Sequence, residues 1–385
     1  MRSRVLASGR AACAWALIAA GVAGCTSSGS ANSSVTVTGN VLTIYVSAAS
    51  TDQPQVARDV LEAEQLAFAG GTHRVGNFAI RLRTVRDATL SDQARTVIQD
   101  KSAVAYLGEI VPGSSADSLG ITNALDILQV TPTDTALELT QATPAVSGAP
   151  DTYYQSLSSY GRTFARVVPT SGVEAKAQVQ EMRALGVTKL YVADDGSPYG
   201  AAIAHAIEQD AGGSLTLVSS QSAADGVFYG SSSEASAAKF FDAAAAANPS
   251  AKLFGPSALA DPSFPSQLSS AVHQLYLSSP GFLKQDQPAA AASFVSTFTS
   301  TYGHAPVPQA IFGYEAMSAV LAVLREAGSD ANNRSTVVHD FLTLKRTQSV
   351  LGPYSINSDG DTSLTAFVFS RLARGSLVPF VQVQG

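Results

Sequence analysis

Two neighbouring serines stand at the start of a predicted helix, where hydroxyl and backbone N–H groups can converge on a ligand. Ser114 and Ser115 follow an apolar segment at residues 103–107, which we expect to be a strand, and they open a predicted helix at 114–124. The first N–H groups of a helix lack partners within the helix, so they attract anionic or polar groups. The alternative is that both serines only cap the helix.

Two threonines belong to the same predicted edge. Thr133 and Thr135 follow the next apolar segment, 127–130. In open α/β sheets ligands bind outside the carboxyl ends of the strands. The four hydroxyl residues are therefore candidates for holding a polar group of a small ligand.

A third candidate is the run Asp194-Asp195-Gly196-Ser197-Pro198-Tyr199-Gly200, which lies between a predicted strand and a predicted helix. Its paired aspartates could coordinate a cation, but Asp-Gly and Ser-Pro are also ordinary turn sequences.

Motifs for catalysis are absent from the sequence. It has no G-x-S-x-G, no Gly-rich loop ending in Gly-Lys-Ser/Thr and no H-E-x-x-H. The five histidines are dispersed, with no pair at helical ligand spacing: His73, His205, His273, His304 and His339. We expect neither an enzyme nor a metal site, and no cofactor.

The elements that must position these residues alternate between strand and helix patterns. From residue 41 to 130 the order is βαβαβαβ, which indicates a parallel sheet covered on both faces. Within this part, Ser91 is expected to cap a helix that runs to about Lys101. The same pattern begins again after a loop at 143–160 rich in Pro, Gly and Tyr. We predict two doubly wound α/β lobes. Three later helices, at 289–302, 309–327 and 335–344, are expected to cover the first lobe, and two strands, at 366–371 and 378–383, end the chain.

The first 25 residues have the layout of an export signal: arginines, an apolar run and small residues. The run Val22-Ala23-Gly24-Cys25 resembles a bacterial lipobox, whose cysteine is acylated and becomes the first residue of the mature protein. An ordinary secretory signal with a chance cysteine is the alternative. The other cysteine, Cys13, would be removed with the signal, leaving no free thiol for chemistry.

Charge argues against nucleic acid as a partner. Removal of the signal leaves 21 basic against 30 acidic residues, a formal charge of −9. Binding to a phosphate backbone requires clustered Lys and Arg.

The chain also resembles the type I periplasmic solute-binding proteins, the leucine/isoleucine/valine-binding family of ABC transporters. The segments that carry the resemblance run in family order from about residue 41 to 370. They are Tyr106 to Ser115 (YLGEIVPGSS), Val130 to Thr140 (VTPTDTALELT), Phe164-Ala165-Arg166, Asp195 to Gly200, Phe228-Tyr229-Gly230, Phe254-Gly255-Pro256, Gly313 to Ala316 (GYEA), Leu351-Gly352-Pro353 and Asp359-Gly360-Asp361.

The resemblance implies two lobes joined by three crossovers near Arg166, Ser278 and Gly352, which close on a ligand. It divides the chain into a lipoprotein signal (1–24), a flexible tether (25–40), a first lobe (41–166 with 279–350) and a second lobe (167–278 with 351–385).

The resemblance further implies that Ser114, Ser115, Thr133 and Thr135 hold the ligand's carboxylate and that Tyr199 contacts it from the second lobe. Amino-acid binders of this family carry an acidic residue directly after the Gly-Pro, where this chain has Ser257, and the resemblance makes Ser257 the sixth expected ligand contact. An amino acid would then need a counter-charge for its ammonium from Glu234 or Asp261.

We therefore expect an extracytoplasmic lipoprotein that is anchored to the membrane through Cys25, binds a small polar ligand such as an amino acid or a related compound, and delivers it to an ABC permease. A ligand sensor feeding a signalling partner, or an anchored enzyme, are the alternatives.

Overall fold

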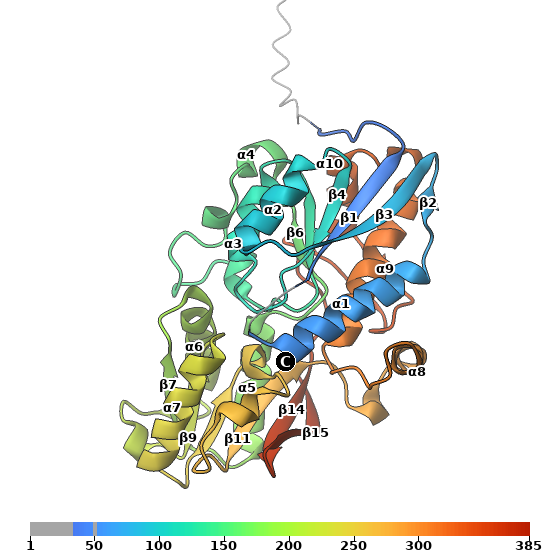
Figure 1. The fold of residues 1–385 in the computed structure, drawn as a ribbon. Coiled ribbons are helices and arrows are strands. Elements are labelled where there is room, and N and C mark those ends of the chain that lie inside the picture. The colour runs from blue at the N-terminus through green and yellow to red at the C-terminus, as the bar shows by residue number, and fades with distance from the viewer. Residues whose placement is uncertain (1–33, 49–51) are drawn as a thin grey trace, which may run out of the picture. The chain divides into compact units, whose positions relative to one another are not determined.

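The computed structural model describes residues 34–48 and 52–385. Cys25 and the predicted signal lie outside these residues. The described chain contains two large sheets, each covered by helices. Figure 1 shows the first sheet in the upper part of the view and the second in the lower part. No helix in the described part of the chain is both long and apolar enough to cross a membrane.

The first sheet has the order β2-β3-β1-β4-β5-β6, and all its strands are parallel except β2. Its strands are β1 (Val41–Ser47), β2 (Arg74–Val75), β3 (Phe78–Val85), β4 (Ala103–Leu107), β5 (Leu128–Thr131) and β6 (Phe164–Arg166). Every residue of β4 and β5 is buried, as expected for strands with helices on both faces.

The helices of this first lobe come from both halves of the chain. They are α1 (Pro54–Ala69), α2 (Leu90–Gln99), α3 (Ala116–Asn123), α4 (Leu157–Tyr160), α8 (Ala289–Tyr302), α9 (Ala310–Ala327) and α10 (Arg334–Leu342). Helices α8, α9 and α10 share one hydrophobic core with the first sheet, as the sequence predicted. Helix α9 crosses α1 at Gly313, where an added Cβ would lie only 2.6 Å from the carbonyl oxygen of Val60. The glycine is what allows the two backbones to approach.

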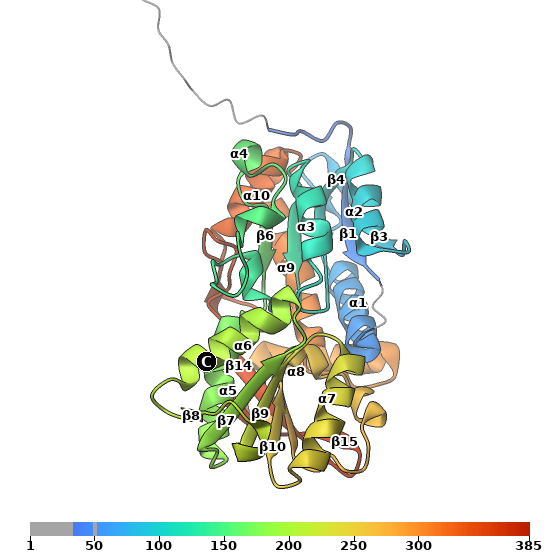
Figure 2. The same ribbon diagram turned by 90° about the vertical axis from the view of Figure 1, so that its left-hand side faces the viewer.

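The second sheet has the order β15-β14-β11-β10-β9-β7-β8, with the antiparallel pair β14 and β15 at one edge. Its strands are β7 (Lys189–Asp194), β8 (Thr216–Leu217), β9 (Gly226–Gly230), β10 (Lys252–Gly255), β11 (Leu275–Pro280), β14 (Ala366–Ala373) and β15 (Ser376–Gln384). Helices α5 (Ser171–Ala184), α6 (Pro198–Ala211) and α7 (Glu234–Ala247) pack on this second lobe, as Figure 2 shows from the side.

The chain passes between the lobes three times: after β6, after β11, and between the short strand β13 (Tyr354–Ser355) and β14. Strand β13 pairs with β12 (Lys345–Arg346), across the limit that we placed at residue 350. The predicted limits of the lobes stay predictions.

Two local predictions differ from the structure. Helix α2 is capped by the side chain of Thr89, whereas Ser91, the predicted cap, donates to the carbonyl of Asp117. The predicted tether reaches residue 40, but Val35 and Val37 form backbone hydrogen bonds with Arg334 and Asn332. The segment around Val37 is thus part of the folded lobe, since Val37 itself is buried in the first-lobe core.

Candidate functional site

A cavity of about 690 Å³ lies at the carboxyl ends of the parallel strands of both sheets. From the first lobe it is lined by the segments after β1, β3, β4 and β5, and from the second by the loops after β7 and β9. Strand order reverses beside β1 in the first sheet and beside β7 in the second. Such reversal points are where open α/β sheets place their ligands, and the volume is typical of small-molecule sites.

Two of the six predicted ligand contacts line this cavity, Ser114 and Tyr199. The Ser114 hydroxyl donates to the carbonyl of Val111 at 2.5 Å. Tyr199 lies in the first turn of α6 and packs against Gly113 of the first lobe. Gly113 has φ of +88°, and a Cβ there would lie 2.9 Å from the Tyr199 Cβ, so the glycine lets the lobes meet at this point.

Two further predicted contacts lie behind the cavity wall. The Ser115 hydroxyl accepts from the N–H of Glu109, and the Thr133 hydroxyl donates to the carbonyl of Ile110 at 2.6 Å. The N–H groups that we expected to be free at the start of α3 already have a partner. Those of Gly113 and Ser115 donate to the Asp134 carboxylate at 2.7 and 2.9 Å.

The remaining two predicted contacts, Thr135 and Ser257, meet with Tyr199 around a buried carboxylate that the sequence did not point to. Glu174, in the first turn of α5, accepts from the Ser257 N–H at 2.5 Å, from the Ser257 hydroxyl at 2.9 Å and from the Ser278 hydroxyl at 2.5 Å. The hydroxyls of Thr135 and Tyr199 have no hydrogen-bond partner among the described residues.

Burial sets the electrostatics of this cluster. It raises the pKa of Glu174, while the hydroxyls of Ser278, Ser257 and Thr135 and the Ser257 N–H act in the opposite direction. Burial, together with the charge of Glu174, also raises the pKa of Tyr199 well above its ordinary value. The Tyr199 hydroxyl therefore stays protonated and can serve as a hydrogen-bond donor.

Neither residue proposed as a counter-charge for an ammonium lines the cavity. The Asp261 carboxylate accepts from the N–H groups of Gln55 and Val56 at 2.9 and 3.0 Å, and so caps α1 from the other lobe. Glu234, whose pKa burial raises to about 7, accepts from the side chain of Gln267.

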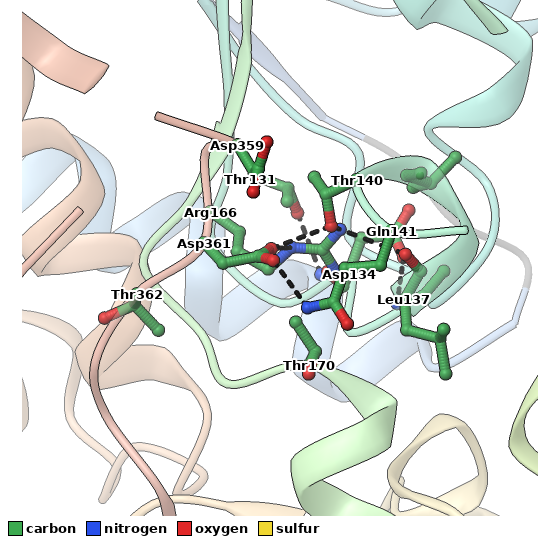
Figure 3. A network of polar contacts seen from close by, with 12 residues as sticks. Thr131, Asp134, Leu137, Thr140, Gln141, Arg166, Thr170, Asp359, Asp361 and Thr362 are labelled. Atoms are coloured by element: carbon green, nitrogen blue, oxygen red, sulfur yellow. Dashed lines mark hydrogen bonds and ion pairs between the residues drawn. The ribbon is translucent and has the colours of Figure 1, made fainter. Parts of the chain in front are cut away.

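A buried polar network joins the first and third crossovers (Figure 3). Arg166, fully buried at the end of β6, forms an ion pair with Asp361 at 3.0 Å and donates to the carbonyl of Asp134. Asp361 also accepts from Thr140 and Gln141. The network links the segments that any hinge motion between the lobes must bend.

The paired aspartates form a turn. Asp194 accepts from the N–H of Gly196, and Asp195 accepts from the N–H and hydroxyl of Ser197. These bonds favour the turn interpretation over a cation site.

Elsewhere in the described chain, Asp59, Glu62 and His304 are close enough to share a metal ion. However, Asp59 accepts from Arg58 and from the Val307 N–H, and His304 lies 3.2 Å from Glu62. These contacts account for the group without a metal.

The sequence reasoning also missed the acidic residues that line the cavity: Asp52, Asp87, Glu109, Asp117 and Glu138. Glu109 follows β4 by two residues. Its place after a buried strand, on the ligand edge, was the available signal.

Comparison with known proteins agrees with this geometry. Residues 87–374 match the family described as periplasmic binding protein. The fold is similar to that of a leucine-binding protein, LivK, from Thermotoga maritima, with 17% identity, a TM-score of 0.72 and coverage of 90% of this chain and 99% of that one.

Two other solved structures have the same fold. A substrate-binding protein from Desulfitobacterium hafniense in complex with Leu is 18% identical, with a TM-score of 0.69 and coverage of 89% of this chain and 100% of that one. A solute-binding protein from R. palustris in complex with benzoate is 17% identical, with a TM-score of 0.68 and coverage of 90% and 97%. No curated protein matches the sequence. The family match spans well over half of the chain, which is therefore a member of the periplasmic binding protein family and has the type I fold of that family.

Proposed function

We propose that this protein is a lipid-anchored solute receptor that captures a small polar ligand between its lobes and delivers it to an ABC permease. The observation that carries the proposal is the cavity at the facing carboxyl ends of the two sheets. Several structures with this fold are of substrate- or solute-binding proteins of transporters, in complex with leucine, isoleucine or benzoate. In this proposal, a lipid on Cys25 keeps the receptor near its permease.

For the ligand contacts we propose Ser114 and Tyr199 at the cavity wall, with Thr135 and Ser257 beside them around Glu174. Ser115 and Thr133 would act from behind by holding the loop after β4 in shape, because both bond to its backbone.

A thermal-shift screen of the mature protein against amino acids, amides, amines, organic acids and sugars tests the proposal. A ligand at a hundred times its dissociation constant should stabilise the fold by about 2.7 kcal/mol. Tyr199→Phe should weaken binding of a hit, while Ser300→Ala, at an exposed position of α8, should not. If no solute of the panel raises the melting temperature, the receptor function is wrong.

The anchor has its own test. Cells that express the full chain should incorporate radioactive palmitate into it, and Cys25→Ala should abolish the label. An unlabelled wild-type chain found in the medium would instead indicate an ordinary secretory signal.

In a sensor role, the ligand-bound protein with its lobes closed would bind a signalling protein in place of a permease. Loss of ligand uptake on deletion of the gene favours transport, whereas unchanged uptake with a lost transcriptional response favours sensing.

A further inference from the structure

The cavity is acidic. Of the residues that line it, five carry a carboxyl group: Asp52, Asp87, Glu109, Asp117 and Glu138. Within the described chain, no Lys, Arg or His lines it. A cleft with charges of one sign concentrates ligands of the opposite sign.

Glu109 is the first of two buried carboxyl groups at the cavity wall that are only partly satisfied. It is 1% exposed, and its Oε1 accepts from the Tyr106 hydroxyl at 2.6 Å. Its Oε2 has no partner among residues 34–48 and 52–385. The nearby hydroxyls of Ser47 and Ser118 donate elsewhere, to Gln93 and to the Ser115 carbonyl.

Glu138 is the second. It lies in the short 3-10 helix η1 (Leu137–Leu139), is 1% exposed and lines the same cavity. Its Oε2 likewise finds no hydrogen-bond partner in the described structure. A buried carboxylate oxygen without a donor is costly, so a donor group that enters the cavity and reaches it would be bound favourably.

The energetic cost shows in their titration. Burial raises the pKa of Glu109 and of Glu138 to about 7 in each case, and the nearby charge of Asp134 acts in the same direction on both. Arg166 opposes the shift at Glu138, but it is already paired with Asp361. A donor or positive charge supplied by a ligand would offset this cost.

The rest of the lining is largely apolar and includes Leu90, Ile110, Val111, Tyr153 and Pro198. Such a wall suits a hydrocarbon chain or a small ring.

We propose that the ligand is an organic cation whose ammonium or guanidinium groups are bound by the free oxygens of Glu109 and Glu138 and whose apolar body lies against the surrounding wall. This inference rests on the proposed receptor function and specifies its ligand class. An ammonium or guanidinium group has only donors, so each such group suits a carboxylate oxygen that has no donor of its own. An organic anion would meet five acidic groups and no cationic side chain from the described lining.

Isothermal titration calorimetry of the full mature chain at pH 7.5 tests the inference, with putrescine, agmatine and arginine as cationic probes and leucine and benzoate as neutral and anionic ones. At least one cationic probe should bind, and more weakly as NaCl is raised. Leucine and benzoate should bind more weakly than that probe.

Two variants test whether these carboxylates bind the cationic groups of the probe. Glu109→Gln and Glu138→Gln should each weaken the best cationic probe by about tenfold or more, the usual effect of losing a hydrogen bond to a charged group. The matched control is Glu181→Gln, a buried glutamate of α5 that does not line the cavity, and it should leave affinity unchanged. If Glu109→Gln does not fold, as judged by circular dichroism, Glu138→Gln decides the matter.

The outcomes separate the two proposals. Tight binding of leucine or benzoate without any cationic probe would overturn the cation inference and leave the receptor function standing. Binding of a cation that neither glutamine variant weakens would overturn the site. If none of the five probes binds, the inference is wrong, while the receptor function then depends on the broader thermal-shift screen.

Discussion

Replacing Asp261 with alanine should favour the open arrangement of the lobes. Helix α1 begins at Pro54, which has no N–H, and the Gln53 side chain does not cap it. The Gln53 side chain instead donates to the Ser257 carbonyl across the lobes at 2.8 Å. The next two N–H groups of α1, from Gln55 and Val56, donate to Asp261. The start of α1 is therefore capped only while the lobes are together.

The size of the effect follows from these bonds. Loss of an N-cap side chain costs about 1 to 2 kcal/mol. Because this cap bridges the lobes, its loss should shift the closing equilibrium by about five- to thirtyfold. A ligand that needs the closed form would lose affinity to the extent that the closed form is depopulated.

Small-angle X-ray scattering of the unliganded protein measures the change. Asp261→Ala should have the larger radius of gyration, and saturating ligand should reduce the difference. Ser263→Ala is the matched control, since it removes one of the two donors to the other oxygen of Asp261 and leaves the bonds to α1 intact. If Asp261→Ala scatters like the wild type and binds the ligand equally well, the cap does not contribute to closure.

Two further predictions concern stability. Arg166→Ala should lower the free energy of unfolding by about 3 to 5 kcal/mol, because it leaves the buried Asp361 carboxylate without its cationic partner. The control Arg162→Ala breaks a more exposed ion pair and should lower it by about 1 kcal/mol or less. Equal losses for the two variants in urea unfolding would contradict the role of burial. For the pH dependence, Glu109 has a folded pKa of about 7 against an ordinary 4.5. Between these two pKa values the folded state holds the proton of Glu109 and the unfolded state has lost it. The contribution of Glu109 to the free energy of unfolding is therefore full below about pH 4.5 and declines by about 1.4 kcal/mol per pH unit as the pH rises toward 7. Glu109→Gln should therefore lose less stability than the wild type between pH 5 and 7.5, and parallel curves for the two would contradict the raised pKa.

The alternation of strands and helices was readable from the sequence because its cause is local. Buried parallel strands such as β4 are continuous apolar runs, and helices such as α8 stand between clear start and stop signals. Short elements were missed, among them β12 and β13, because two residues are too few to show a period.

The site was less predictable because hydrogen bonds across long sequence separations decide which groups are free. The start of α3 has the residues of an anion site, but Asp134, 19 residues away, accepts from it. Ser257 has the position of a ligand contact, but Glu174, 83 residues away, accepts its hydroxyl. No local pattern reveals such a partner. The resemblance pointed to two loops that line the cavity, those of Ser114 and Tyr199.

The position of Glu174 bears on the acidic residue that the resemblance leads one to look for directly after Gly255-Pro256. This chain has Ser257 there, and the Glu174 carboxylate lies against its N–H and hydroxyl. Three donors from its own lobe, counting Ser278, occupy Glu174. The Glu174 carboxylate is therefore bound by the protein itself, whereas Glu109 and Glu138, which line the cavity from the first lobe, each keep an oxygen without a partner among the described residues.

Exchanging Ser257 and Glu174 tests whether the Glu174 carboxylate occupies the space that an acidic side chain at position 257 would take. Ser257→Glu alone would bury a second carboxylate beside Glu174 and remove one of its donors, so the free energy of unfolding should fall by about 3 kcal/mol or more. Adding Glu174→Ser removes the repulsion, so the double variant should recover part of that loss, with a coupling of about 1 to 3 kcal/mol in a double-mutant cycle. Urea unfolding measures all four proteins. Strictly additive losses would mean that Glu174 does not occupy the space of the missing acidic side chain, since two carboxylates competing for one buried position must be coupled.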